Sequence, residues 1–247
     1  MAEIADQIFW WLDGNRLSQW GALGDPTDEK AEVTFTSNEE KRIVGLPGKR
    51  SGEENFTFQD YDAPTMVILE SYDTNTEIAF AKTLNPAAGQ PCIMYRGRLL
   101  SNASPLEGNV LALRRMRFKV SSGSGKCYGK NLYPYTTDIT APANGSTITI
   151  GALTATQSLL MMQHVEAVTG AGNFDAKIVS DPAGVPADAK VFTQVAHTDV
   201  AALANHNSGQ FALFNGAKAA TDYRYEITAV SGGTWNVQVC AVVIDEL

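Results

Sequence analysis

The chain has 247 residues and a mass of 26.6 kDa, which suits one large β domain or two ordinary ones. Its 44% hydrophobic share, with ten Phe, eight Tyr and four Trp, is enough to fill a core and favours a folded chain over a disordered one. The formal net charge is -8 and the pI is about 4.9. Because phosphate neutralisation needs Lys and Arg, this acidic balance argues against a protein that grips nucleic acid.

Charge is distributed unevenly along the chain. Residues 1–130 carry 15 Lys/Arg against 17 Asp/Glu, whereas residues 131–247 carry 4 against 10. The shift lies close to a stretch rich in Ser, Gly, Pro and Asn that includes SSGSGK and APANGS. We therefore expect a first domain at 1–125, a linker at 126–145 and a second domain at 146–247.

The first part of the chain predicts a β domain with one short helix. An aromatic opening segment at 4–12 favours either a first strand or a short helix. A helix is expected at 65–72, with Asp62 as N-cap and Pro64 in the first turn. Gly and Pro break the pattern at 45–48 and predict a polar loop up to 55. The expected strands are 32–36, 56–59, 77–83, 92–100 and 110–121.

The second part predicts a β-sandwich of about seven short strands. Tyr223, Tyr225 and Ile227 alternate with polar residues, as do Trp235, Val237 and Val239 in the last strand. This alternation places one face of each strand in a core, and the turn spacing is typical of an immunoglobulin-like sandwich. The expected strands are 147–150, 159–168, 174–180, 191–195, 210–214, 223–230 and 234–243. The fold class expected for the whole chain is therefore mainly β.

Motifs that would signal catalysis or metal binding do not occur. The pair Gly125-Lys126 resembles the end of a phosphate-binding loop, but Val120 and Cys127 stand where Gly and Ser/Thr are required. The three histidines, His164, His197 and His206, form no HExxH motif, and no GxSxG is present. We therefore expect no enzyme activity, no catalytic residue, no cofactor and no metal.

The cysteines and the chain start are also uninformative about chemistry. Cys92, Cys127 and Cys240 form no CxxC pair and are expected to be buried free thiols. The first residues lack the pattern of a secretory leader, and the apolar runs are too short to span a bilayer. No membrane partner is expected.

The basic residues that alternate along the strand expected at 110–121 have two possible roles. Arg115, Arg117 and Lys119 alternate with Met116 and Phe118, so they share one face of the expected strand. The row either binds DNA or faces solvent or a neighbouring subunit whose acidic residues pair with it. The acidic total favours the second reading.

The order of several motifs resembles the tail tube (major tail) proteins of siphophages. The matching runs in the first half are WLDGNRLSQW, AEVTFTSNEEKRIVGLPGKRSGEENFTF, APTMVILESYD and YRGRLLSNASPLEGNVLALRRMRFKVSSG. The second half resembles a β-sandwich that is often attached to phage tail proteins, through GAGNFDAKIVSD, KVFTQVAH and TDYRYEITAVSGGTWNVQVCAVV. Together the two resemblances cover nearly the whole chain.

The resemblance implies a structural virion protein. In that family six copies form a ring, strands of all six line a channel, and rings stack into a tube through which DNA passes during ejection. The expected first domain is a β-barrel or sandwich, and the expected partners are copies of the chain and other tail proteins. DNA would pass through the lumen without specific binding. The protein would be assembled in the host cytoplasm and located in the phage tail.

Two further functions remain open at this point. A capsid decoration or tail-terminator protein would also be acidic, β-rich and non-enzymatic. Alternatively, the second domain could be an adhesion module that binds carbohydrate through Trp235 and Tyr223 or Tyr225, although their alternation predicts that these rings face the core.

Two segments are the expected subunit interface. The polar 45–55 loop carries two charges of each sign and could find complementary charge on an identical neighbour. Aromatic residues of the opening segment would supply apolar contacts. The interface residues expected from these arguments are Phe9, Trp10, Trp11, Lys49, Arg50, Glu53 and Glu54.

Overall fold

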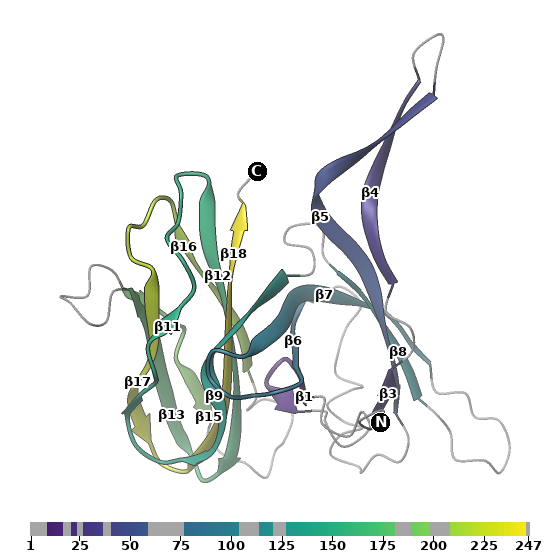
Figure 1. Ribbon diagram of the computed structural model, residues 1–247. Coiled ribbons are helices and arrows are strands. Elements are labelled where there is room, and N and C mark those ends of the chain that lie inside the picture. The colour runs from purple at the N-terminus through teal and green to yellow at the C-terminus, as the bar shows by residue number, and fades with distance from the viewer. Residues whose placement is uncertain are drawn as a thin grey trace, which may run out of the picture. The chain divides into compact units, whose positions relative to one another are not determined.

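In the residues that the computed structural model describes, all regular elements are strands (Figure 1). It describes residues 9–16, 21–23, 27–36, 41–58, 77–103, 114–120, 127–180, 189–197 and 208–245. The mainly β fold class expected from the sequence is confirmed. The helix expected at 65–72 lies outside the described residues.

The chain divides into two compact units, which are described separately below. Unit 1 comprises Met1–Gln19, Ala79–Met94 and Cys127–Leu247, and unit 2 comprises Trp20–Ile78 and Tyr95–Lys126. Two short segments from the first half of the chain, Met1–Gln19 and Ala79–Met94, thus belong with the C-terminal part. The independence of 1–125 and 146–247 stays a prediction.

Unit 1 contains a long sheet whose first four strands follow the order β16, β12, β18 and β9. These strands are Ser208–Asn215, Gln157–Thr169, Thr234–Asp245 and Cys127–Ile139. Beyond β9 the order continues with β7, β6, β1 and β2. Their bounds are Pro91–Ala103, Glu77–Thr83, Phe9–Leu12 and Asn15–Arg16. The neighbouring strands of this series whose register the structure describes are all antiparallel.

A second sheet of unit 1 is centred on β17 and β13. Its strands are β10 (Ala143–Asn144), β11 (Ile148–Thr149), β13 (Gly172–Ser180), β14 (Ala189–Val191), β15 (Val195–His197) and β17 (Asp222–Ser231). The single strand expected at 191–195 is in fact two short strands that pair with opposite ends of β13. The polar residues Thr193 and Gln194 lie between them.

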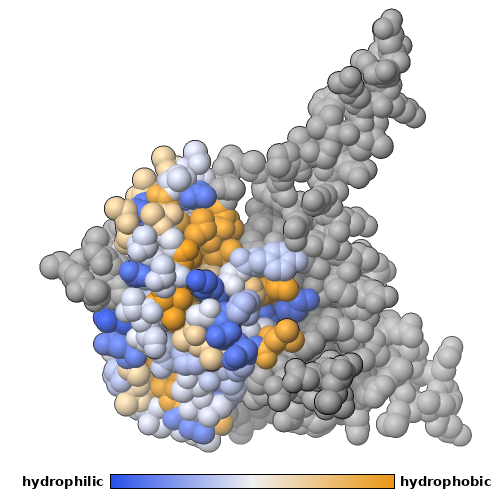
Figure 2. All heavy atoms as spheres, in the orientation of Figure 1, coloured by the Kyte–Doolittle hydropathy of each residue, from blue (hydrophilic) through white to orange (hydrophobic). Residues whose placement is uncertain are grey.

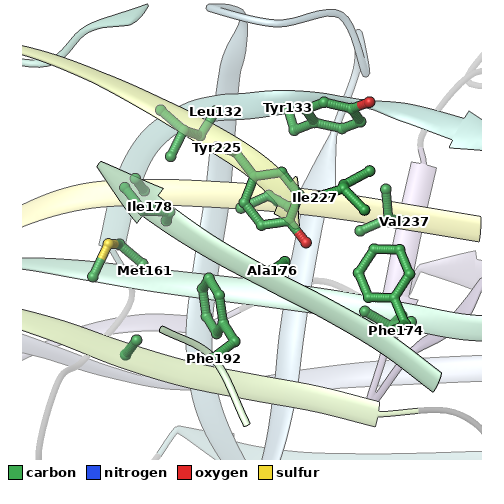
Figure 3. Close-up of a cluster of buried hydrophobic side chains, with 14 of the residues drawn as sticks. Leu132, Tyr133, Met161, Phe174, Ala176, Ile178, Phe192, Tyr225, Ile227 and Val237 are labelled. Carbon is green, nitrogen blue, oxygen red and sulfur yellow. The ribbon is translucent and has the colours of Figure 1, made fainter. Parts of the chain in front are cut away.

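The core of the sandwich lies between these two sheets (Figure 3). Tyr223, Tyr225 and Trp235 are each 0% exposed, so the alternation seen in the sequence does direct these rings inward. The Phe174 and Trp235 rings lie 5.6 Å apart, and the Tyr133 and Tyr225 rings lie 5.2 Å apart, in tilted arrangements that aromatic pairs favour.

Strand β12 is buried on both faces. Leu159 and Met161 face the core between the sheets, whereas Leu160 and Met162 face a second cluster that includes Trp11. Ala79, Ala81, Cys92, Met94, Cys240 and Val242 complete the buried part of that cluster. A strand covered on both sides needs no polar face, which explains why residues 159–162 are continuously apolar rather than alternating.

Strand β9 occupies most of the expected linker. The Ser, Gly and Pro composition near it suggested a flexible segment, but Asn131 and Leu132 are both 0% exposed. The strand pairs with β18 in an irregular register and with β7 on its other side. A Cβ at Gly129 would lie 2.2 Å from the Ala241 carbonyl oxygen, so the close approach of β9 and β18 requires glycine there.

Unit 2 contains β3 (Gly21–Leu23), β4 (Thr27–Thr36), β5 (Lys41–Phe58), β8 (Arg114–Val120) and the later part of β7. The loop expected at 45–55 is wrong, because β5 runs through it. Lys30 pairs with Arg50 and Glu32 pairs with Gly45, so one residue of β4 opposes four residues of β5, at 46–49. Pro47 has no N–H to donate to the ladder, so the Gly and Pro residues at 45–48 mark a large bulge within β5 and not a break in the strand.

Candidate assembly surface

The outer part of the β4–β5 hairpin is a two-stranded ribbon. Residues 28–36 of β4 pair with residues 41–52 of β5. The β5 residues that pair with β3 or β8 all lie at 53–58. Among the described residues the ribbon therefore has no third strand. Two-stranded hairpins are marginally stable in water, and unpaired strand edges are templates for another chain.

The two strands of the ribbon carry opposite charge in the sequence. Residues 27–36 of β4 contain Asp28, Glu29 and Glu32 against one Lys. Residues 41–52 of β5 contain four basic residues, which are Lys41, Arg42, Lys49 and Arg50, and no acidic residue. One edge of the ribbon thus belongs to an acidic strand and the other to a basic strand.

All four charged interface residues expected from the sequence lie on β5. Lys49 is within the bulge, and Arg50 is the register partner of Lys30. Glu53 and Glu54 lie beyond the ribbon, where β5 also pairs with β8, and Glu53 is the register partner of Lys119. An acidic residue thus stands opposite one member of the basic row within the same chain, a favourable cross-strand combination.

The aromatic interface residues lie on β1. Trp11 is only 2% exposed and packs inside unit 1, with its ring 5.6 Å from that of Tyr135. The backbone of Phe9 and Trp10 pairs with β6, whereas their side chains lie outside the described part of the structure. The sequence could not show which of these aromatic residues is buried, because both alternating faces of this segment are aromatic or apolar.

The turn between β1 and β2 contacts the sandwich. Asp13 and Gly14 have positive φ angles of 48° and 88°, as a type I′ hairpin turn requires. The Asp13 carboxylate oxygen Oδ1 accepts a 3.1 Å hydrogen bond from the Gly209 backbone N–H. The Gly14 N–H donates to Nδ1 of His164 at 3.1 Å. A segment at the start of the chain is thereby fixed to β12 and β16.

Burial perturbs both titratable groups of this contact. It raises the pKa of the Asp13 carboxyl to about 6, although the hydrogen bond from Gly209 opposes the shift. It lowers the pKa of His164 to about 3, so the imidazole is neutral at neutral pH. Because Nδ1 accepts a hydrogen bond, the proton resides on Nε2, which lies 3.1 Å from the Met162 sulfur.

A small hollow lies beside this contact. Trp11, Tyr135, His164, Glu166 and Gln238 contribute to its walls, and its empty space is about 130 Å³. Ligand pockets are typically larger, at about 300–1,000 Å³. The amide oxygen of Gln238 is buried there and lacks a hydrogen-bond partner among the described residues. The hollow is therefore too small to carry a small-molecule site.

No cluster of side chains that could hold a metal ion occurs among the residues that the structure describes. Groups of three or more His, Cys, Asp or Glu with metal-ligand spacing are absent from that part of the chain. Cys92 and Cys240 are buried free thiols, as expected, and Cys127 begins β9. His197 ends β15, with its side chain outside the described set, and His206 lies outside the described residues.

The described surface mixes polar and apolar residues (Figure 2). Leu84, Tyr128 and Val191 are the large apolar residues that are most exposed in this part, at 73%, 54% and 68%. Tyr128 lies on β9, Val191 lies on β14 and Leu84 follows the end of β6, and single exposed apolar residues are ordinary. In the described residues, no helix is long and apolar enough to cross a bilayer.

Comparison with known proteins gives only distant structural likeness. No protein-family profile and no curated protein matches the chain. Two solved chains of the phage p2 baseplate in its activated conformation, with Sr and with Ca, align at TM-scores of 0.31 and 0.32 and 8% identity. The alignments cover 94% and 97% of this chain and 97% and 99% of those chains. A chain of infectious bursal disease virus Gx strain aligns at a TM-score of 0.26 and 12% identity, covering 96% of this chain and 66% of that chain. These TM-scores are too low to establish a shared fold.

Proposed function

We propose that this chain is a non-enzymatic structural protein of a bacteriophage virion, and that it assembles with copies of itself into a tail tube. The observation that carries the proposal is the β4–β5 ribbon, with an acidic strand at one edge and a basic strand at the other. The specific role is proposed from the order of motifs along the chain, which resembles that of siphophage tail tube proteins.

The ribbon is self-complementary in a head-to-tail sense. The acidic edge of β4 in one copy fits the basic edge of β5 in the next copy, and the reverse edges remain free for further copies. Such a heterologous contact closes into a ring when its rotation permits. Strand pairing between copies would also stabilise a ribbon that has no third strand of its own among the described residues.

The net charge suits a channel for DNA. A chain with a formal net charge of -8 offers passing DNA little to hold, because non-specific binding depends on Lys and Arg contacts to phosphate. The proposed partners are other copies of the chain and other tail proteins, and the proposed location is the phage tail. The proposed ring contains six copies, as in the resembled family.

Negative-stain electron microscopy of the purified full chain tests this role. A tail tube subunit should form rings or stacked tubes. Uniform monomers or trimers at all concentrations would contradict the proposal and favour a capsid decoration protein. Isolated single rings that never stack would favour a tail terminator.

Charge reversal tests the ribbon as the contact. The Arg50→Glu variant should assemble less than the wild type at low salt, because the basic edge would then repel the acidic edge of its neighbour. Lys190→Glu is the matched control, since Lys190 is exposed on β14 and the change alters the net charge equally. Equal assembly of both variants would remove the ribbon from the interface.

A second pair of variants tests the head-to-tail arrangement. Arg50→Glu and Glu29→Lys should each assemble poorly alone, whereas an equimolar mixture should recover assembly, because each altered edge meets an altered partner. A mixture that remains unassembled would rule out pairing of β4 with β5 between copies.

The three aromatic residues through which the alternative function would bind carbohydrate are not accessible to a sugar. Trp235, Tyr223 and Tyr225 are fully buried between the two sheets, so their rings offer no platform for a sugar. The Tyr225 hydroxyl donates to the Gln163 amide oxygen at 2.5 Å inside the core. Their role is packing.

A further inference from the structure

The sequence contains two Asn-Gly pairs, Asn144-Gly145 and Asn215-Gly216. In such a pair the backbone nitrogen of glycine can attack the side-chain carbonyl carbon of asparagine, because glycine has no side chain to hinder the approach. The reaction needs an amide nitrogen that is free to move and a side chain that can fold back on the main chain. The structure places the two pairs in opposite situations.

Asn144-Gly145 is held in place. Asn144 ends strand β10 and pairs with Glu226 of β17. The Gly145 N–H donates a 2.8 Å hydrogen bond to the Tyr225 carbonyl oxygen. A Cβ at Gly145 would lie 2.6 Å from the Tyr133 ring, so the backbone is also tightly packed. The attacking nitrogen is therefore fixed in the sheet.

In the Asn215-Gly216 pair, by contrast, the asparagine is exposed and there is free space beside the glycine. Asn215 is the exposed last residue of β16, and Gly216 follows outside the strand with a φ of 78°. A Cβ at Gly216 would meet no atom within 4 Å. Among the described residues no acceptor is found for the Gly216 N–H. The Ser158 hydroxyl donates to Oδ1 of Asn215 at 3.3 Å, which polarises the carbonyl that would be attacked.

We propose that Asn215 is a site of spontaneous deamidation, whereas Asn144 is protected by the fold. The Gly216 nitrogen gives up its proton and forms a bond to Cγ of Asn215, the bond from Cγ to the side-chain amide nitrogen breaks, and that nitrogen takes up the proton and leaves as ammonia. Water then opens the five-membered imide at either carbonyl and yields aspartate or isoaspartate. Water is the sole co-reactant, and no electrons are transferred.

The product changes both charge and backbone at the end of β16. Each event adds one negative charge, which takes the formal net charge from -8 to -9. The isoaspartate form also adds a methylene group to the main chain within residue 215, which pairs with Ser158. This inference rests on local geometry in unit 1 and does not depend on the proposed assembly.

Peptide mass spectrometry of the aged full-length protein tests the proposal. In the folded protein, conversion at Asn215 should be at least about tenfold faster than at Asn144, equivalent to about 1.4 kcal/mol of local opening at the protected pair. In concentrated urea the two rates should become similar, since both pairs are Asn-Gly. The Asn215→Gln variant should release correspondingly less ammonia. Equal rates in the folded protein, or faster conversion at Asn144, would overturn the proposal.

Discussion

Gly14 donates its backbone N–H to Nδ1 of His164 across 3.1 Å, although 150 positions separate the two residues. The neighbouring Asp13 makes the matching contact to Gly209. Each contact involves a titratable side chain that folding has buried, and burial favours the neutral form of both. Their effects on stability therefore depend on pH with opposite signs.

We predict that Asp13→Asn becomes more stable relative to the wild type as pH rises. The folded pKa of Asp13, about 6, exceeds the ordinary value of 3.8, so the folded state holds this proton more tightly. The stability that protonated Asp13 gives to the wild type is fully present below pH 3.8. It declines by about 3 kcal/mol as the pH rises from 3.8 through the folded pKa of about 6. Urea denaturation of both proteins from about pH 4 to about pH 7 measures the difference. A constant difference across this range would show that Asp13 ionises normally in the fold.

We predict the reverse for His164→Gln. The pKa of His164 is lowered from 6.5 to about 3, so its contribution is fully present above 6.5 and is lost as pH falls toward 3. The variant does not titrate, and its stability relative to the wild type should rise on acidification by up to roughly 5 kcal/mol. Its amide oxygen can still accept from Gly14. A relative stability that falls on acidification would contradict the buried neutral imidazole.

We predict that Asn131→Ala destabilises unit 1 by about 3 kcal/mol, because it leaves several buried groups unpaired. The Asn131 amide donates to the carbonyl oxygens of Asn85 and Ala87, and its oxygen accepts from Gln238 at 2.8 Å. The control is Asn236→Ala, whose side chain is only partly buried and should cost less than about 1 kcal/mol. If thermal or urea unfolding shows equal losses of stability in the two variants, the buried hydrogen bonds of Asn131 contribute no more than the partly buried ones of Asn236.

We predict that Trp11→Ala lowers stability by about 3–5 kcal/mol, because it empties a site in the second cluster of unit 1. Circular dichroism during urea denaturation measures this loss. For Phe9 and Trp10 a role in subunit contact stays a prediction, and Trp10→Ala is the informative comparison. Loss of assembly with unchanged unfolding would place Trp10 at the interface, whereas a loss of stability like that of Trp11→Ala would place it in the core.

Limited proteolysis tests the predicted division into domains. If 1–125 and 146–247 are independent, the first cut should fall between residues 121 and 145. The pairing of β9 with β7 and β18 protects residues 127–139, so the accessible part of this window is narrow. A first cut within residues 159–180 would contradict the boundary.

The sequence by itself determined the fold class and most strand positions. The strand expected at 77–83 coincides with β6, and the alternation of Tyr223, Tyr225 and Ile227 correctly identified the buried face of β17. These features are local, because a period of two along a strand depends only on neighbouring residues and one buried face.

Only the tertiary structure decided which segments pair and which aromatic residues are buried. The sequence did not predict strand β9, because its segment is rich in turn-forming residues. The strand is stabilised by pairing with β7 and β18, which are distant in sequence. The hydrogen bond between Gly209 and Asp13 joins residues 196 positions apart, and the sequence around neither residue indicates that the other lies beside it. Burial and long-range hydrogen bonds are properties of the packed chain, whereas local propensity reports only what each segment could form.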